Sequence, residues 1–521
     1  MTAEHPAGTT TRLEEAQRQL IDLLGREAVL TNEGQVAEFH DPYEGANATE
    51  YQPSFVVQPA DVAGVQAVVR VAADLGVPVW TSSQGRNYGY GGSAPIVNGS
   101  IVLNLRRLNR VLEIDERGAW ALVEPGVTFA DLYAEIKRRN LKLWISVPDL
   151  GWGSVVGNAL EHGQGYTVYG DHSTAVAGLE VVLADGDILR TGQGAFPDSE
   201  AGYRYKRAFG PSVDALFMQS NFGVVTKMAI WLMPEPEVFT TGTVNADRDE
   251  DIVALIDALA PLVLDGTIQG QPLIVGAAEP ADGRVLPGED TSSASKARKL
   301  SAAFPGPRWA ARIGFYGDTA IVEARVAAVR RAIADLDGIT VDLRTYPGNA
   351  TADLVHPADL VPAGIPNQFL LEQLKAQFGD RIGHVDFSPV IPFTGEAAAR
   401  HERLVREVLD AEGLVAGFAW IAGPRALTGA CMVLFDSDDD QEREAAFRAV
   451  TTLVERARKL GWAEYRSHPR LVEDVAATFD FGDRALRRFY GRIKDALDPA
   501  GILSPGNHGI WPGAAPAVAE E

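Results

Sequence analysis

The chain has 521 residues, 46% of them hydrophobic and 22% charged, which is typical of a globular protein with more than one domain. Its net charge of −23 at pH 7 argues against nucleic acid or an anionic membrane surface as a partner. The single cysteine, Cys431, excludes an internal disulfide and a cysteine metal cluster, and its apolar surroundings indicate a buried core thiol.

The N-terminal part begins with alternating helices and strands. The spacing of apolar residues predicts a helix over 13–24, and a short apolar run predicts a strand at 54–57. Asp61 is a plausible cap for a second helix, which Gly76 ends. The next strand is expected at 77–80, so this stretch reads as a strand–helix–strand unit.

Two hairpins are predicted farther along, over 111–123 and 179–189, because polar turns separate short apolar strands there. Many strands with a few helices favour the α+β class. A break is expected near Pro234, and residues 240–460 form a second unit with Ala- and Arg-rich helices, such as one over 320–336.

Three runs interleave glycines with polar side chains, at 85–92, 148–166 and 219–227. Glycines let the backbone approach a ligand closely, and successive N–H groups can wrap a pyrophosphate. The first run is neither a G-x-G-x-x-G fingerprint nor a Walker loop, so a tight loop without a ligand is the alternative. Asp149, in the second run, is either a turn residue or a carboxylate that faces a cofactor ring.

The three runs, in this order, resemble the vanillyl-alcohol oxidase/para-cresol methylhydroxylase family of flavoproteins. Residues 85–95 are similar to the family's pyrophosphate loop, and 147–151 with 165–172 are similar to the segment that follows it. Residues 464–468 and 494–502 are similar to the C-terminal part. The likeness is greatest to the family's eugenol-oxidase and vanillyl-alcohol-oxidase members.

The resemblance implies an α+β, two-domain FAD-binding fold of the vanillyl-alcohol oxidase type. Residues 1–237 would form the N-terminal part of an FAD domain with two α+β subdomains. Residues 238–461 would form an α+β cap domain over the isoalloxazine, and residues 462–521 would return to the FAD domain. The likeness is weakest in the expected cap.

The resemblance also implies oxidation of para-substituted phenols, such as vanillyl alcohol, eugenol or 4-alkylphenols. Asp149 matches the active-site aspartate beside flavin N5, where a carboxylate accepts a proton. Tyr90, Tyr465 and Arg466 match the trio that holds the substrate as a phenolate. Hydride transfer from the benzylic carbon to N5 then gives a para-quinone methide, to which water adds or from which a proton leaves.

His384 matches the family histidine that bonds covalently to FAD, and His40 matches a histidine that helps deprotonate it. Without the resemblance, a lone histidine at a strand start is usually structural. The other residues expected to bind FAD are Gly85, Arg86, Asn87, Gly89, Gly91, Gly92, Pro148, Gly151, Ser154, Gly165, Gly223, Val224, Val225 and Asn507.

Tyr166, Arg425 and Thr428 are expected to line the substrate pocket. Residues 425–429 stand where vanillyl-alcohol and eugenol oxidases carry Arg-Glu-Met-His-His. The loss of two bulky rings at Thr428 and Gly429 is therefore expected to enlarge or reshape the cap side of the pocket. Asn507 stands where those enzymes carry lysine, and the next residue, a histidine, is a candidate to replace its positive charge.

The expected electron acceptor is O2, reduced to hydrogen peroxide, because the cytochrome-coupled family members bind flavin through tyrosine rather than histidine. A cytochrome-coupled 4-alkylphenol dehydrogenase is the alternative, and a flavin-binding protein without catalysis is a third. Asp149 and the phenolate trio together argue against the third. The family implies a homodimer or an assembly of dimers. No metal site is expected, and no membrane-spanning or signal segment is recognised, so a cytoplasmic protein is expected.

Overall fold

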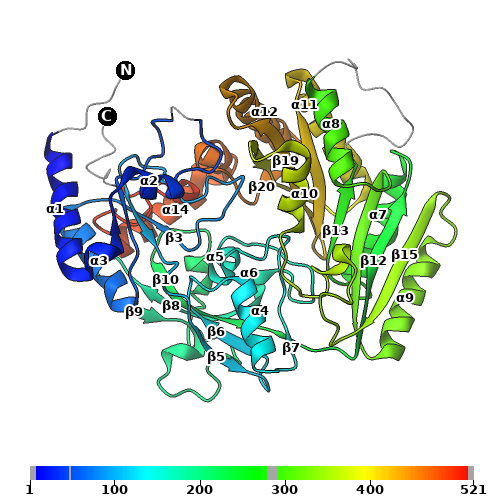
Figure 1. Ribbon diagram of the computed structural model, residues 1–521, viewed down its shortest axis with the longest axis horizontal. Coiled ribbons are helices and arrows are strands. Elements are labelled where there is room, and N and C mark those ends of the chain that lie inside the picture. The colour runs from blue at the N-terminus through cyan, green and yellow to red at the C-terminus, as the bar shows by residue number, and fades with distance from the viewer. Residues whose placement is uncertain (1–6, 46–47, 278–291, 514–521) are drawn as a thin grey trace.

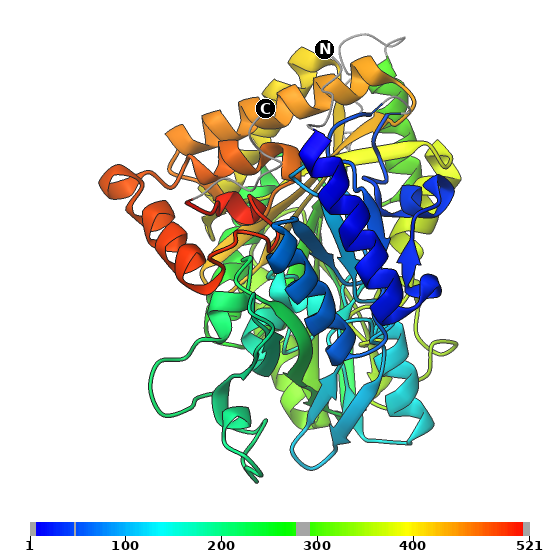
Figure 2. The same cartoon turned by 90° about the vertical axis from the view of Figure 1, so that its left-hand side faces the viewer.

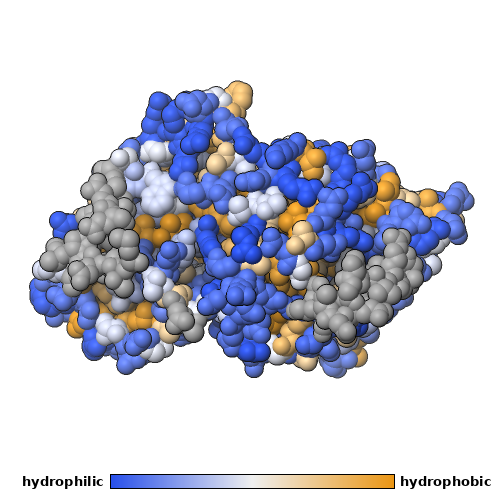
Figure 3. Space-filling model, turned by 90° about the horizontal axis from the view of Figure 1, so that it is seen from above, coloured by the Kyte–Doolittle hydropathy of each residue, from blue (hydrophilic) through white to orange (hydrophobic). Residues whose placement is uncertain are grey.

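The computed structural model describes residues 7–45, 48–277 and 292–513. Two α+β lobes lie side by side (Figure 1). The N-terminal segments up to β10, from blue through cyan to bluish green, share one lobe with the C-terminal segment, in red, and the segments from β12 to α12 form the other. Hydrophilic residues occupy much of the face seen from above (Figure 3). This mixture of helices and sheets confirms the predicted α+β class.

The first sheet has four strands in the order β1-β2-β4-β3. Asp61 caps the helix that covers it by accepting from the N–H of Gly64, and Gly76 ends this helix at φ 64°, as predicted. The apolar face of this helix packs with α1 against the sheet. The elements are α1 (Ala7–Leu24), β1 (Val29–Leu30), α2 (Glu33–Val36), β2 (Phe55–Val57), α3 (Val62–Leu75), β3 (Val79–Ser82) and β4 (Ile101–Asn104).

The second sheet has five strands in the order β5-β6-β10-β8-β9 and contains both predicted hairpins. Its core is continuous with residues of the cap lobe, such as Val361 and Ile421. The elements are β5 (Val111–Asp115), β6 (Trp120–Val123), α4 (Phe129–Arg138), α5 (Val155–Leu160), α6 (His172–Ala175), β8 (Val176–Val182), β9 (Ile188–Arg190) and β10 (Val224–Trp231), with the pair β7 (Leu143–Trp144) and β11 (Met233–Pro234) beside them.

A nine-stranded antiparallel sheet forms the cap lobe, in the order β15-β12-β14-β13-β18-β19-β17-β20, with β16 also paired to β19. The strands are β12 (Val238–Ala246), β13 (Gln269–Gly276), β14 (Trp309–Gly317), β15 (Ile339–Pro347), β16 (Ile382–Phe387), β17 (Pro389–Pro392), β18 (Val415–Ala422), β19 (Ala426–Asp436) and β20 (Ala463–Glu464). The helices are α7 (Asp251–Leu264), α8 (Ser292–Ala303), α9 (Thr319–Ile333), α10 (Phe369–Phe378), α11 (Gly395–Glu412) and α12 (Asp440–Lys459).

One face of this sheet packs against α7, α9, α11 and α12 and forms the largest apolar core. Cys431 lies in this core as a free thiol, and burial raises its pKa well above the ordinary value, as expected for a structural cysteine. The predicted helix over 320–336 is confirmed as α9, although it ends three residues earlier. The opposite face of the sheet is turned towards the first lobe, where Arg312 of β14 meets Asp149.

The C-terminal segment contains α13 (Val472–Ala476) and α14 (Phe481–Leu497) and then runs along β3 (Figure 2). The N–H of Val79 donates to the carbonyl of Ile502 at 2.8 Å, and the N–H of Ser504 donates to the carbonyl of Val79 at 2.7 Å. Buried Lys494 pairs with Asp498 at 2.8 Å. Residues more than 400 positions apart therefore complete one sheet edge.

Within the described part of the chain, no helix is both long enough and apolar enough to cross a membrane.

Candidate active site

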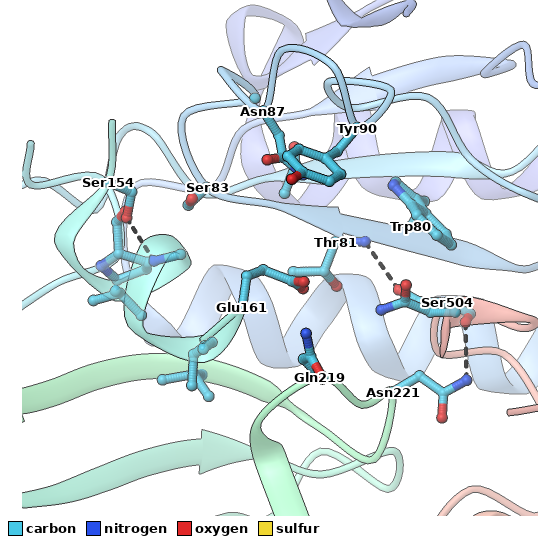
Figure 4. Close-up of a pocket in the computed structure, with 18 of the residues that line it drawn as sticks. Trp80, Thr81, Ser83, Asn87, Tyr90, Ser154, Glu161, Gln219, Asn221 and Ser504 are labelled. Atoms are coloured by element: carbon cyan, nitrogen blue, oxygen red, sulfur yellow. Dashed lines mark hydrogen bonds between the residues drawn. The ribbon is translucent and has the colours of Figure 1, made fainter. Parts of the chain in front are cut away.

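A cleft of about 240 Å³ opens where the first lobe meets the C-terminal segment (Figure 4). Asn87 and Tyr90 lie on one side of it, and Gln219 and Asn221 lie on the other. The loop after β3 supplies the first side and the segment before β10 supplies the second. The cleft is therefore built from segments that are remote in sequence.

The glycine-rich loop 85–92 requires its glycines for conformation and for space. Gly85 has φ 69°, and a Cβ there would lie 2.3 Å from Oγ of Ser93. Gly92 has φ 59°, and a Cβ there would lie 2.8 Å from Cδ of Pro42. Any larger residue at these positions would have to displace a neighbour and adopt a strained backbone.

The residues predicted to bind FAD divide into two groups. Those that line the cleft are Gly85, Arg86, Asn87, Gly92, Ser154, Gly223, Val225 and Asn507. The others serve packing around it: a Cβ at Gly91 would meet Pro469, and Val224 lies in the apolar core. The remaining predicted positions outside the lining are Gly89, Pro148, Gly151 and Gly165.

The phenolate trio is brought together at the cap side of the cleft. The guanidinium carbon of Arg466 lies 4.2 Å from the centroid of the Tyr90 ring, and the Tyr465 hydroxyl interacts with both. Arg466 also donates to Oδ1 of Asn87, and its buried Nε has no partner among the described residues. The Tyr90 hydroxyl lies 2.8 Å from Oγ of Ser388.

Burial raises the pKa of Tyr90 well above its ordinary value, and Arg466 only partly offsets this. Burial also raises the pKa of Tyr465, again against the effect of Arg466. Both hydroxyls therefore keep their protons at neutral pH and remain hydrogen-bond donors. Two neutral donors and one cation form a site for a small anionic oxygen.

Asp149 and Tyr166 also meet, together with a residue that the sequence reasoning did not single out. The Tyr166 hydroxyl donates to Oδ2 of Asp149, and Arg312 from β14 approaches Oδ1 at 3.3 Å. The guanidinium carbon of Arg312 lies 4.2 Å from the centroid of the Tyr166 ring. Burial and the Asp149 charge raise the pKa of Tyr166 well above its ordinary value, so this hydroxyl stays protonated.

His384 lies on β16, where its imidazole packs against the glycine-rich loop. A Cβ at Gly89 would lie 2.5 Å from Cε1 of His384, so only glycine allows this approach. Nδ1 of His384 lies 2.7 Å from Oδ1 of Asp386. His40 pairs instead with Glu44 at 2.7 Å, and no hydrogen bond among the described residues joins the two histidines.

Asn507 and His508 follow the 502–504 segment that pairs with β3, and both line the cleft. Nε2 of His508 lies 3.3 Å from the Glu161 carboxylate. Although burial acts to raise it, His508 and Arg466 lower the pKa of Glu161 to about 2. The cleft therefore contains an ionised glutamate, which the sequence reasoning missed.

The two cap residues predicted for the pocket lie in different settings. Arg425 is exposed at the turn between β18 and β19, and its pocket role stays a prediction. Thr428 is paired with Ile421 and with Val390 on the sheet face opposite the helices. A Cβ at Gly429 would lie 2.7 Å from Pro389, on the helix-covered face, so Gly429 does not enlarge the pocket as expected.

Comparison with known proteins identifies the family. Residues 53–192 match the FAD binding domain model, and residues 370–508 match the FAD linked oxidases, C-terminal domain model. The flavoprotein subunit of 4-cresol dehydrogenase (hydroxylating) from Pseudomonas putida is 32% identical over 516 residues, an alignment that spans 97% of both proteins. The chain belongs to the vanillyl-alcohol oxidase/para-cresol methylhydroxylase family.

Solved structures agree with this family. The 4-ethylphenol oxidase from Gulosibacter chungangensis, in complex with isoeugenol, superposes with a TM-score of 0.89 at 34% identity and covers 98% of this protein and 99% of its own length. A substrate-bound para-cresol methylhydroxylase superposes with a TM-score of 0.87 at 31% identity and covers 98% and 99%. The protein is therefore an FAD-dependent oxidoreductase of the vanillyl-alcohol oxidase/para-cresol methylhydroxylase family.

The cleft fits FAD. Its glycine-rich loop admits close backbone approach, and the buried Oδ1 of Asn221 has no hydrogen-bond partner among the described residues. Polar residues of the lining that the sequence reasoning missed are Ser83, Glu161 and Ser504, which belong to no compact motif. Gln219 and Asn221 also line the cleft, and both lie in the run at 219–227 that the sequence singled out.

Proposed function

We propose that the protein oxidises para-substituted phenols with FAD as the hydride acceptor. The observation that carries this proposal is the cluster in which the Arg466 guanidinium lies over the Tyr90 ring and the Tyr465 hydroxyl interacts with both residues. Such a site favours a phenolate over a neutral phenol, because two donors and a guanidinium stabilise one oxygen anion. The 4-cresol dehydrogenase and 4-ethylphenol oxidase relatives support a para-alkyl substituent.

Different residues of the site act on the phenolate oxygen and on the para substituent of the substrate. Tyr90, Tyr465 and Arg466 hold the phenolate oxygen, whose negative charge weakens the benzylic C–H bond through the ring. FAD, when bound, accepts the hydride. Asp149 then accepts the proton that is released when water adds to the quinone methide or when the para substituent loses a proton.

His384 is the residue we propose for a covalent link to FAD. The hydrogen bond to Asp386 occupies Nδ1 and leaves Nε2 as the nitrogen free to form a bond. Contact with Gly89 places the imidazole against the cofactor loop. We therefore propose Asp386 as the group that orients the linking histidine, and the role of His40 in its deprotonation stays a prediction.

O2 is the electron acceptor that we propose, with hydrogen peroxide as the product. Support comes from the resemblance of His384 to the linking histidine of the oxidases and from the 4-ethylphenol oxidase relative. A cytochrome-coupled dehydrogenase is the second candidate, favoured by the 32% identity to a 4-cresol dehydrogenase flavoprotein subunit.

The test is a panel of 4-cresol, 4-ethylphenol, vanillyl alcohol and eugenol, incubated with the holoenzyme in air. Peroxide and oxygen consumption are measured without an added acceptor, and turnover is then measured anaerobically with an artificial one-electron acceptor. Peroxide formation matched to phenol loss supports the oxidase. Turnover only with the artificial acceptor supports the dehydrogenase, and no turnover under either condition overturns the proposed function.

A further inference from the structure

We propose that Arg312 is a positioning residue that fixes the Asp149 carboxylate and thereby sets the fate of the quinone methide. This inference rests on the proposed oxidation of phenols. It concerns the second half of the reaction, in which the intermediate either adds water or loses a proton from its para substituent. The phenolate trio has no part in that choice.

The geometry around Asp149 supports this role. Arg312 holds Oδ1 at 3.3 Å and the Tyr166 hydroxyl donates to Oδ2, so the carboxylate is tethered at both oxygens. A carboxylate accepts about four hydrogen bonds, so each oxygen keeps a free lone pair. The plane of the base is therefore fixed while its ability to accept a proton remains.

Arg312 is itself held by the sheet and by an aromatic ring. It lies on β14 opposite Leu273, which pairs with Ile421, which in turn pairs with Thr428. Directly paired residues of antiparallel strands share a face, so these four residues form a row on the side away from the helices. The Tyr166 ring packs 4.2 Å from the guanidinium.

Two further features argue for a role beyond a surface ion pair. Arg312 comes from the cap lobe and Asp149 from the other lobe, so their contact spans the interface. Nε of Arg312 is buried and has no partner among the described residues, although Arg312 sits beside the Asp149 carboxylate. An unpaired buried donor costs free energy, and a purely structural arginine would be expected to satisfy it.

Both fates of the intermediate send one proton to Asp149. Loss of hydride from a 4-ethylphenolate to FAD gives a neutral quinone methide. In the first branch, the oxygen of water bonds to the benzylic carbon, Asp149 takes a proton from that water, and the ring oxygen regains its negative charge. In the second branch, a C–H bond of the methyl group next to the benzylic carbon breaks, Asp149 takes this proton, and a vinylphenolate forms.

These protons leave different positions, so the orientation of the carboxylate decides which branch is faster. A tethered Asp149 presents the free lone pair of each oxygen in a constant direction. Release of the tether by Arg312→Gln lets the carboxylate rotate. Both the rate and the ratio of alcohol to vinyl product then change.

The experiment compares the holoenzyme with Arg312→Gln, Arg312→Lys and Tyr166→Phe. An exposed arginine on α9, changed by Arg330→Gln, is the matched control. Turnover of 4-ethylphenol and its alcohol-to-vinyl ratio are measured by chromatography. Binding of 4-bromophenol, which has no benzylic hydrogen, is measured separately by titration.

Arg312→Gln is expected to lower kcat at least about tenfold, with an altered product ratio, because general-base efficiency depends on geometry. The dissociation constant of 4-bromophenol is expected to stay within about twofold, since the phenolate trio is intact. Arg312→Lys is expected to restore part of kcat, and Tyr166→Phe is expected to change the ratio by releasing the other oxygen.

An unchanged product ratio in Arg312→Gln, or an equal loss of kcat and phenol affinity, overturns the inference while leaving the proposed function intact. If Arg312→Gln does not fold, Arg312→Lys provides the test. Lysine keeps the positive charge but lacks the planar set of guanidinium donors, so the product ratio of this variant must differ from that of the parent. A parent enzyme that oxidises none of the phenols overturns the proposed function and this inference together.

Discussion

Nδ1 of His384 lies 2.7 Å from Oδ1 of Asp386, two positions farther along the same strand. Residues two apart on a strand share a face, so β16 presents the imidazole and the carboxylate together. The pairing fixes which imidazole nitrogen carries the proton and which is free. We therefore propose that the reactivity of the linking histidine depends on this pairing within its own strand.

We expect His384→Ala to release FAD into the supernatant on acid precipitation, whereas the parent gives a yellow pellet. Asp386→Asn should slow formation of the link, because an amide does not stabilise the positive charge that develops on the imidazole. His40→Ala serves as the comparison. A colourless parent pellet contradicts the covalent link, and a larger effect of His40→Ala than of Asp386→Asn contradicts the role of Asp386.

Arg466→Lys should weaken binding of 4-bromophenol about 10- to 100-fold. Lysine lacks the planar set of guanidinium donors and loses a hydrogen bond to the phenolate, and a hydrogen bond to a charged group contributes about 1.5–3 kcal/mol. Ultraviolet absorbance of the bound ligand reports its ionisation, and the phenolate band should decrease in the variant. Arg330→Lys, on the exposed surface of α9, is the control. Equal affinities would show that Arg466 does not contact the phenolate.

Thr428→Phe should narrow the pocket on its cap side, because Thr428 lies in the same row as Ile421 and Arg312. We expect kcat/KM for 4-propylphenol to fall about tenfold more than kcat/KM for 4-cresol. Thr428→Val keeps the volume and should leave the ratio of the two unchanged. A uniform loss for both substrates would place residue 428 outside the pocket.

The buried imidazole of His401 makes the cap sensitive to acid. Burial lowers the pKa of His401 to about 3, while Nδ1 accepts a hydrogen bond from Trp420 at 3.0 Å. The unfolded protein binds a proton at this histidine below about pH 6.5, and the folded protein does so only near pH 3. The effect of His401 on the free energy of unfolding is therefore absent above about pH 6.5. Between about pH 6.5 and 3 it lowers this free energy by up to about 1.4 kcal/mol per pH unit.

His401→Gln retains an acceptor for Trp420 but does not titrate. We expect its Tm to fall less steeply than that of the parent between about pH 6.5 and 4.5. A second deeply buried histidine, His172, has a pKa lowered by burial to about 4 and contributes equally to both proteins. Parallel Tm curves for the two proteins would refute the role of His401.

Local rules explain what could be predicted about the fold. Asp61 and Gly76 bound α3 because a side-chain acceptor begins a helix and a left-handed glycine ends one. The phenolate trio could be predicted only through the family resemblance, since Tyr90 and Arg466 are far apart in sequence. Their contact depends on the return of the C-terminal segment to the first lobe.

Other parts of the site depend on contacts between remote segments. Glu161 and His508 are 347 positions apart, and neither belongs to a motif. Arg312 did leave a signal, because a charged residue interrupts the apolar strand β14, but nothing in the sequence identifies Asp149 as its partner. Asp386 was within reach of sequence reasoning, because a strand period of two places it beside His384.

The hydrogen bonds between Val79 and the 502–504 segment determine when the first sheet can be completed during synthesis. A ribosome adds about 5–20 residues per second, so roughly 20–80 s pass between the synthesis of β3 and that of the 502–504 segment with which it pairs. One wall of the cofactor cleft, including Ser504, Asn507 and His508, is missing throughout that interval. The nascent polypeptide therefore lacks a complete cofactor cleft until residues 504–508 have been made, and we expect cofactor uptake to follow the synthesis of this segment.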